Sequence, residues 1–108
     1  MVYNFADILF VDFPLSDATG IKKRSALVLL DSGDADVLVA RISGQTPRSP
    51  YDILLNDWEE ASLLLPSTVR LDKLATIDKR FVRRALGKLS EQDTKKLKRS
   101  LFIMNSKE

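Results

Sequence analysis

The sequence predicts a small, mainly β domain, built as a strongly bent antiparallel sheet or half-open barrel with helices attached. Three observations predict this fold. Five or six short apolar runs have mostly local connections, and the regular strand–helix alternation of a parallel sheet is missing. In addition, 108 residues with 44% apolar side chains suffice for one core. We therefore expect a single domain over residues 1–108.

The first half of the chain predicts three strands. Residues 8–13 form an apolar run rich in large side chains, which favours a buried strand. Residues 14–24 contain Pro, Gly, Ser and Asp without periodicity and predict a long loop with a basic end. Residues 25–31 and 37–42 are further strand-like runs, joined through a Ser-Gly-Asp turn as an antiparallel hairpin.

The middle of the chain predicts a loop, a strand and a short internal helix. Residues 44–50 are polar and predict the loop, and residues 51–55 can form the strand. Asn56 can cap a helix over residues 57–64, because acidic side chains occupy its first turn. Pro66 ends that helix.

The last third predicts two strands and a C-terminal helix. Residues 68–77 begin with clean alternation of apolar and polar side chains, as in a half-buried strand. Residues 81–89 are ambiguous between strand and helix, although their glycine favours a strand. Ser90 begins a pattern that resembles a capping box, and a stripe of apolar side chains predicts a final helix to about residue 104.

The composition excludes several classes of site. The chain has no cysteine and no histidine, so it lacks thiolate nucleophiles, disulfides, and the commonest metal ligand and general acid–base. Neither a Gly-rich nucleotide motif nor a pattern of metal-ligating carboxylates is present, so we expect no cofactor and no metal. The N-terminal apolar run is far short of the roughly 20 residues that cross a bilayer, which predicts a cytoplasmic protein without membrane contact.

The net charge of +2 conceals an uneven distribution. Residues 1–69 carry 5 basic and 10 acidic side chains, whereas residues 70–108 carry 12 basic and 5 acidic ones. A clustered basic segment can attract a polyanion such as RNA. The alternative is that these lysines and arginines are the ordinary solvated sides of short elements.

Three cations precede the second predicted strand. Lys22, Lys23 and Arg24 lie where the basic loop enters the strand, and the planar guanidinium of Arg24 suits a phosphate because it can bind two oxygens. The alternative interpretation is a cluster of cations on the surface.

Two further groups carry polar side chains suited to chemistry. Ser43, Gln45 and Thr46 supply hydroxyl and amide groups after a strand, either for binding or to stabilise the loop. Arg70 and Asp72 are two apart and therefore project to one face of their strand. They form either a simple salt bridge or, if that face lines a groove, a base with a neighbouring phosphate-binding cation.

Six segments, taken in order, resemble the MazF/PemK toxins, which are the ribonuclease partners of type II toxin–antitoxin operons. The similar segments are ADILFVDFP at residues 6–14, KKRSALVLL at 22–30, VLVARISGQ at 37–45, YDILLNDW at 51–58, LLLPSTVRLDKLATIDKR at 63–80 and GKLSEQD at 87–93. The ordered set spans nearly the whole chain, and it is more specific than any one segment.

The resemblance implies an SH3-like, half-open barrel of the CcdB/PemK type with a C-terminal helix, arranged as a two-fold homodimer. It also implies a metal-independent endoribonuclease for single-stranded RNA, in which the 2′-hydroxyl of the RNA attacks the adjacent phosphate. The products are a 2′,3′-cyclic phosphate and a 5′-hydroxyl. A cognate antitoxin, with an acidic and apolar segment that folds on binding, is expected over the same groove.

Four residues match the family's catalytic positions. Arg24 matches the arginine that begins the second strand, Ser43 matches a hydroxyl residue, and Arg70 with Asp72 matches an R-x-D motif. In the implied mechanism Asp72 or a neighbour takes the 2′-hydroxyl proton, the arginines stabilise the phosphorane, and Ser43 hydrogen-bonds a phosphate oxygen. RNA-binding positions are expected at Lys22, Lys23, Gln45 and Thr46, with the loop over residues 14–23 closing on the RNA.

The sequence departs from the family pattern at three positions. Ala6 replaces a glycine, which the fold tolerates if the backbone there takes a negative φ. Ser25 replaces a proline after Arg24, and Ser43 replaces the commoner threonine. The alternative function is a non-catalytic RNA- or protein-binding module on the same fold.

Overall fold

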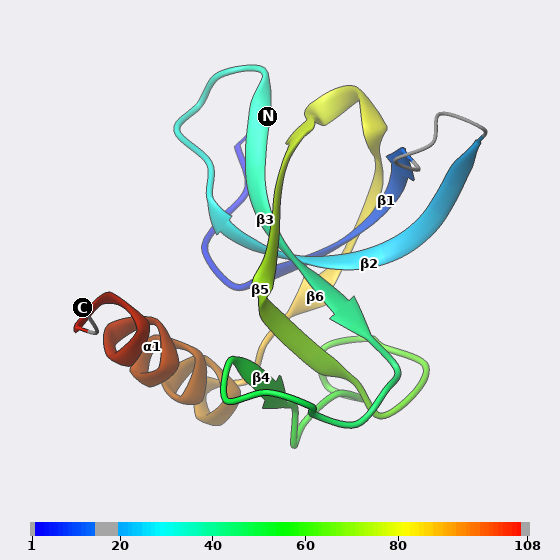
Figure 1. Ribbon diagram of the computed structural model, residues 1–108. Helices are drawn as coiled ribbons and strands as arrows, with labels where there is room; N and C mark the ends of the chain where they lie inside the picture. The colour runs from blue at the N-terminus through cyan, green and yellow to red at the C-terminus, as the bar shows by residue number, and fades with distance from the viewer. Residues whose placement is uncertain (1, 15–19, 107–108) are drawn as a thin grey trace.

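The computed structural model describes residues 2–14 and 20–106 (Figure 1). Within them lies one antiparallel sheet of six strands in the order β4-β5-β3-β2-β1-β6, followed by a C-terminal helix. The elements are β1 Asp7–Pro14, β2 Ile21–Leu30, β3 Asp36–Ser43, β4 Asp52–Leu54, β5 Thr68–Asp78, the 3-10 turn η1 Lys79–Phe81, β6 Val82–Lys88 and α1 Glu91–Ser106.

The sheet is strongly bent and does not close, because its edge strands β4 and β6 pair only with β5 and β1 among the described residues (Figure 1). The expected mainly β, half-open fold with a C-terminal helix is thereby confirmed. The ambiguous segment 81–89 is a strand over most of its length, as its glycine suggested.

The loop expected over residues 14–24 is shorter than predicted. β2 begins at Ile21, and Lys23 and Arg24 already pair with Asp12 and Val11 of β1. The polar composition of this segment did not indicate a strand. The segment is nevertheless a strand, because its backbone pairs with that of β1. Residues 15–19 lie outside the described part of the chain, and with them most of the loop expected to close on RNA.

The short internal helix expected over residues 57–64 is wrong. The segment forms turns, in which the amides of Ala61 and Ser62 donate to the carbonyls of Asp57 and Glu59 at 3.2 and 3.0 Å. Ser62 then takes φ 68°, a left-handed conformation that ends a helix. A helix of one or two turns is only weakly stabilised by its own hydrogen bonds. The burial of Ala61 and Leu63 therefore determines the path of the chain.

Ala6 also departs from expectation, because its φ is 73° rather than negative. Its amide donates to the carbonyl of Val28 at 2.9 Å, and its carbonyl accepts from the amide of Leu89 at 3.0 Å. These two bonds hold the backbone in a conformation that costs an alanine about 1–2 kcal/mol. The family's glycine would occupy it without that cost.

Each face of the sheet carries its own apolar cluster. One includes Ile8, Leu27, Ile42 and Leu71, and Leu97 of α1 completes it. The other is formed on the opposite face by alternate residues of the same strands: Leu9, Val11, Ala26, Val28, Val37, Val39 and Ile77. Because both faces are packed, the central strands β1, β2 and β3 form a rigid support.

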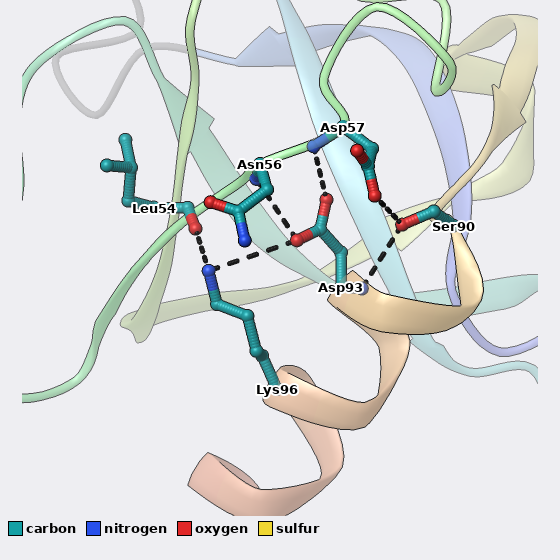
Figure 2. Close-up of polar contacts among 6 residues, drawn as sticks. All are labelled: Leu54, Asn56, Asp57, Ser90, Asp93 and Lys96. Atoms are coloured by element: carbon teal, nitrogen blue, oxygen red, sulfur yellow. Dashed lines mark hydrogen bonds and ion pairs between the residues drawn. The ribbon is translucent and has the colours of Figure 1, made fainter.

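A buried carboxylate attaches α1 to the sheet (Figure 2). The side chain of Asp93 accepts hydrogen bonds from the amides of Asn56 and Asp57 at 3.1 and 2.9 Å. The hydroxyl of Ser90 accepts from the Asp93 amide at 3.1 Å and donates to the Asp57 carboxylate at 2.6 Å. Ser90 thus caps the helix as expected. The Asp93 carboxylate binds the segment after β4 and not the backbone amide of Ser90, which a capping box would bind.

This attachment predicts an unequal effect of two acidic residues in the first turn of α1. Asp93→Ala leaves two amides without their acceptor and lowers the free energy of unfolding by about 3 kcal/mol. Glu91→Ala is the matched control, since its exposed ion pair with Lys95 contributes less than about 0.5 kcal/mol. Urea denaturation measures both. Equal stabilities for the two variants would contradict the role of Asp93.

A second carboxylate predicts how stability depends on pH. Asp31 accepts from the Tyr3 amide at 2.7 Å, the Gly33 amide at 2.8 Å and the Lys79 ammonium at 2.9 Å. The Tyr3 amide and then Lys79 lower the pKa of Asp31 to about 2. A lowered pKa stabilises the fold above the unfolded value of about 3.9 and loses that contribution as pH falls towards 2. Asp31→Asn should therefore lower the free energy of unfolding at pH 6. Urea denaturation at a series of pH values should show that the difference from the wild type shrinks between pH 4 and pH 2. A difference that stays constant with pH would contradict this prediction.

Candidate functional site at the fork of two strands

Strands β2 and β3 pair along part of their length and then separate (Figure 1). Their pairing reaches Ala26 and Arg41. Beyond this point Arg24 pairs with Val11 of β1, whereas Ser43 pairs with Thr68 of β5. Each strand follows its outer neighbour, so the two diverge, and a groove of about 360 Å³ lies at this fork.

The groove has a buried apolar floor and cations at its exposed side. Ile42 and Leu63 are buried, while Lys23 and Arg84 are exposed. Its lining contains three cations and, among the described residues, no carboxylate. The lining residues are Phe10, Lys23, Arg24, Ser25, Ile42, Ser43, Gly44, Ser62, Leu63, Leu64, Leu65, Ser67, Arg84 and Leu86. Such a lining favours an anionic ligand that also has an apolar surface.

Two predicted catalytic residues, Arg24 and Ser43, come together in this groove. The hydroxyl oxygen of Ser43 accepts from the Gln45 amide at 3.1 Å, which leaves its proton free to donate to a ligand. Of the expected RNA-binding residues, Lys23 lines the groove, whereas Gln45 and Thr46 are exposed just beyond its lining.

Arg84 is a groove residue that sequence reasoning did not single out. It pairs with Phe10 across β1 and β6, and its guanidinium lies 5.7 Å from the centre of the Phe10 ring. The basic run in the second half of the chain pointed to Arg84 only as one cation among many. Its place in the groove depends on the register between β6 and β1, which the sequence does not reveal.

Three arginines occupy one face of the sheet beside the groove. Arg41 lies directly opposite Ala26 of β2 and Arg70 of β5, so these side chains share a face. Arg24 is two residues from Ala26 on β2 and therefore lies on the same face. We call Arg24, Arg41 and Arg70 the arginine row. Arg41 and Arg70 are direct neighbours across β3 and β5, whereas Arg24 lies two residues beyond Ala26, where β2 has left β3.

The members of the arginine row differ in how they are neutralised. The Arg70 Nε lies 3.5 Å from Oδ1 of Asp52, whose side chain is 1% exposed. Neither Arg24 nor Arg41 forms an ion pair with any described carboxylate. Burial, and then the positive charge of Arg41, lower the pKa of Arg24 below its usual value. Arg24, which lines the groove, and Arg41, which lies beside it and outside its lining, are thus two neighbouring cations without a described carboxylate partner.

Several buried polar atoms around the arginine row lack a hydrogen-bond partner among the described residues. They are Nε of Arg41, Nε of Arg70, Oδ1 of Asp52 and Oγ1 of Thr68. Buried donors and acceptors in folded proteins are nearly always paired. Nε of Arg70 and Oδ1 of Asp52 are the two atoms of the 3.5 Å ion pair, so Nε of Arg41 and Oγ1 of Thr68 are the members of this group that have neither a hydrogen bond nor an ion pair in the described structure.

Asp72 does not join Arg24 and Ser43 in the groove. It is exposed and lies in an irregular part of β5, where Arg70 and Leu74 oppose the consecutive residues Arg41 and Ala40 of β3. Arg70 forms its ion pair with Asp52, and no salt bridge between Arg70 and Asp72 is present in the described part of the chain. The exposed Lys22 also lies outside the groove lining.

The described residues offer neither a metal site of clustered acidic side chains nor a membrane-spanning helix. No group of three or more acidic side chains that could hold a metal ion comes together in residues 2–14 and 20–106. The one helix of those residues is neither long nor apolar enough to span a membrane.

The fold is similar to several solved structures. A crystal structure of MazE-MazF from Deinococcus radiodurans matches with a TM-score of 0.76 at 15% identity, covering 100% of both chains. An endoribonuclease in complex with its cognate antitoxin, from a mycobacterial species, matches with a TM-score of 0.75 at 16% identity over 98% of each chain. The Mycobacterium tuberculosis toxin MazF-mt6 matches at 0.72 with 20% identity, covering 94% of this chain and 98% of that one.

No curated protein matches the chain by sequence. A family model does, over residues 4–104, and its description is "PemK-like, MazF-like toxin of type II toxin-antitoxin system". The match spans all six strands and nearly all of α1. The chain therefore belongs to the PemK/MazF-like toxin family of type II toxin–antitoxin systems.

Proposed function

We propose that this chain is a toxin that cleaves single-stranded RNA at the fork between β2 and β3, without a metal ion. The observation that carries the proposal is the meeting of Arg24 and Ser43, from different strands, in one groove lined by cations and by no described carboxylate. Every RNA linkage carries a negative charge, which such a groove attracts. In this proposal the charge that a metal ion would supply comes from arginines.

The proposed reaction is an internal transfer of the phosphate. The 2′-hydroxyl loses its proton to a base and attacks the adjacent phosphorus, and the 5′-oxygen leaves with a proton. Arg24 stabilises the negative charge that grows on the phosphate oxygens, and Ser43 donates a hydrogen bond to one of them. Arg70, whose charge Asp52 compensates, would donate to the RNA backbone beside the fork.

Asp72 is our candidate for the base, although it lies outside the groove lining. β5 is irregular between Arg70 and Leu74, so strand alternation does not determine the face on which Asp72 lies. Its exposure leaves it accessible to a ribose hydroxyl of RNA that extends from the fork across β5. Lys22, Gln45 and Thr46 are exposed around the same region and would contact the flanking nucleotides.

A cognate antitoxin is the second proposed partner, and two of the structural relatives were solved with theirs. Leu64 and Leu65 line the groove yet are 91% and 63% exposed, beside Lys23 and Arg84. An acidic and apolar segment of the antitoxin would cover the leucines and pair with the cations, and it would thereby keep RNA out of the groove.

We further propose a homodimer that acts in the cytoplasm, where mRNA is found.

Mutation of Arg24 tests this function. Arg24→Ala should lower kcat on a labelled single-stranded RNA in excess EDTA by about 10²-fold or more, because one stabilising donor at the phosphate is lost. Arg80→Ala is the matched control, since Arg80 is exposed and pairs only with Asp78 in the described structure. It should cut at the wild-type rate.

Two outcomes would contradict the proposal. A wild-type cleavage rate for Arg24→Ala would show that RNA is not cleaved at the fork. Salt-sensitive RNA binding without any cut product from the wild-type protein would favour the alternative, a non-catalytic binding module on the same fold.

A further inference from the structure

Arg41 is the most unusual member of the arginine row. It lies in the middle of the sheet, opposite Ala26 on one side and Arg70 on the other. Its Nε is buried and has no hydrogen-bond partner among the described residues, and it forms no ion pair with them. The Arg41 residue as a whole is only partly buried, but a buried donor such as its Nε is ordinarily paired.

The nearest charges make the position of Arg41 costly. Arg41 is close enough to Arg24 to lower the pKa of the latter, and Arg70 lies directly opposite. Asp52 compensates Arg70 at 3.5 Å, but no described carboxylate lies within ion-pair distance of Arg24 or Arg41. Two neighbouring cations on a packed sheet repel one another, and a bound anion would remove that repulsion.

The proposed reaction supplies such an anion. A phosphodiester carries one negative charge, whereas the pentacoordinate phosphorane formed by attack of the 2′-hydroxylate carries two. One arginine neutralises the single negative charge of the phosphodiester in the ground state. A second arginine stabilises the additional charge that develops in the transition state. A group of this kind raises kcat more than it lowers KM.

We propose that Arg41 is a second phosphate-binding arginine, which holds together with Arg24 the phosphate group that enters the fork. The identity of that phosphate as the one being cleaved rests on the ribonuclease function proposed above. Ser43 lies two residues from Arg41 on β3, so it projects to the same face and donates to the same anion. In this arrangement Arg70 with Asp52 is the neutral end of the arginine row, and Arg24 with Arg41 is the anion-binding end.

Kinetics of single-stranded RNA cleavage provide the first test. Arg41→Gln should lower kcat by about 10²-fold while KM changes less than about threefold, and Arg41→Lys should recover part of the loss because it restores the charge. Arg80→Gln removes one exposed arginine of η1, which follows β5 and lies outside the arginine row, and it should leave kcat unchanged. A wild-type kcat for Arg41→Gln would overturn the proposal.

Sulfate, a dianion of similar shape to phosphate, provides a second test that needs no catalysis. Sulfate at saturating concentration should raise the Tm of the wild type and of Arg80→Gln equally, by about 3 °C. The rise should be less than half as large in Arg41→Gln. Equal rises in all three proteins would overturn the proposal, even if Arg41→Gln had lost activity, because a purely structural role would give that result.

The two tests separate the anion site from the ribonuclease function. If the wild type cuts no RNA while its sulfate response still depends on Arg41, the anion site is supported and the ribonuclease function fails. The Tm without sulfate gives the remaining control. Arg41→Gln should be at least as stable as the wild type, because the substitution removes a repulsion between like charges.

Discussion

The divergence of β2 from β3 is the constraint on which the candidate site depends. Beyond Ala26 and Arg41, β2 stays paired to β1 and β3 stays paired to β5, so the sheet opens between its two central strands. The opening places Arg24 and Ser43 on either side of one groove. Both strands are packed on their two faces up to that point, which fixes the positions from which these side chains project.

The segments after β4 complete the groove, and their position depends on two close contacts. Gly87 of β6 allows residues 61 and 62 to approach, since a Cβ there would lie 3.1 Å from the Ala61 carbonyl oxygen and from the Ser62 hydroxyl. Asp93 of α1 holds the amides of Asn56 and Asp57 just before this turn (Figure 2). The helix and β6 therefore position Leu63 in the groove without contributing a catalytic group themselves.

The sequence predicted those parts of the fold that local patterns determine. The strand over residues 68–77 and the helix cap at Ser90 are examples, and the ordered motifs identified the family. It did not predict the turn at residues 57–64, where burial of Ala61 and Leu63 and the left-handed Ser62 outweigh an acidic helix start. Nor did it single out Arg84, which lines the groove, or Arg41, which lies beside it, because only the strand register places these two arginines. Asp72 and Arg70, chosen from their spacing on one strand, both lie outside the groove lining, which contains no residue of β5.

The chemical identity of the ends left on RNA tests the central claim most directly. In the proposed reaction the attacking nucleophile is the 2′-hydroxyl of the RNA itself, and arginines at the fork supply the stabilising charge. Single-stranded RNA cut by the purified protein in excess EDTA should carry a 2′,3′-cyclic phosphate on one fragment and a 5′-hydroxyl on the other. Fragments with a 5′-phosphate, or cleavage that stops when EDTA is added, would contradict the account.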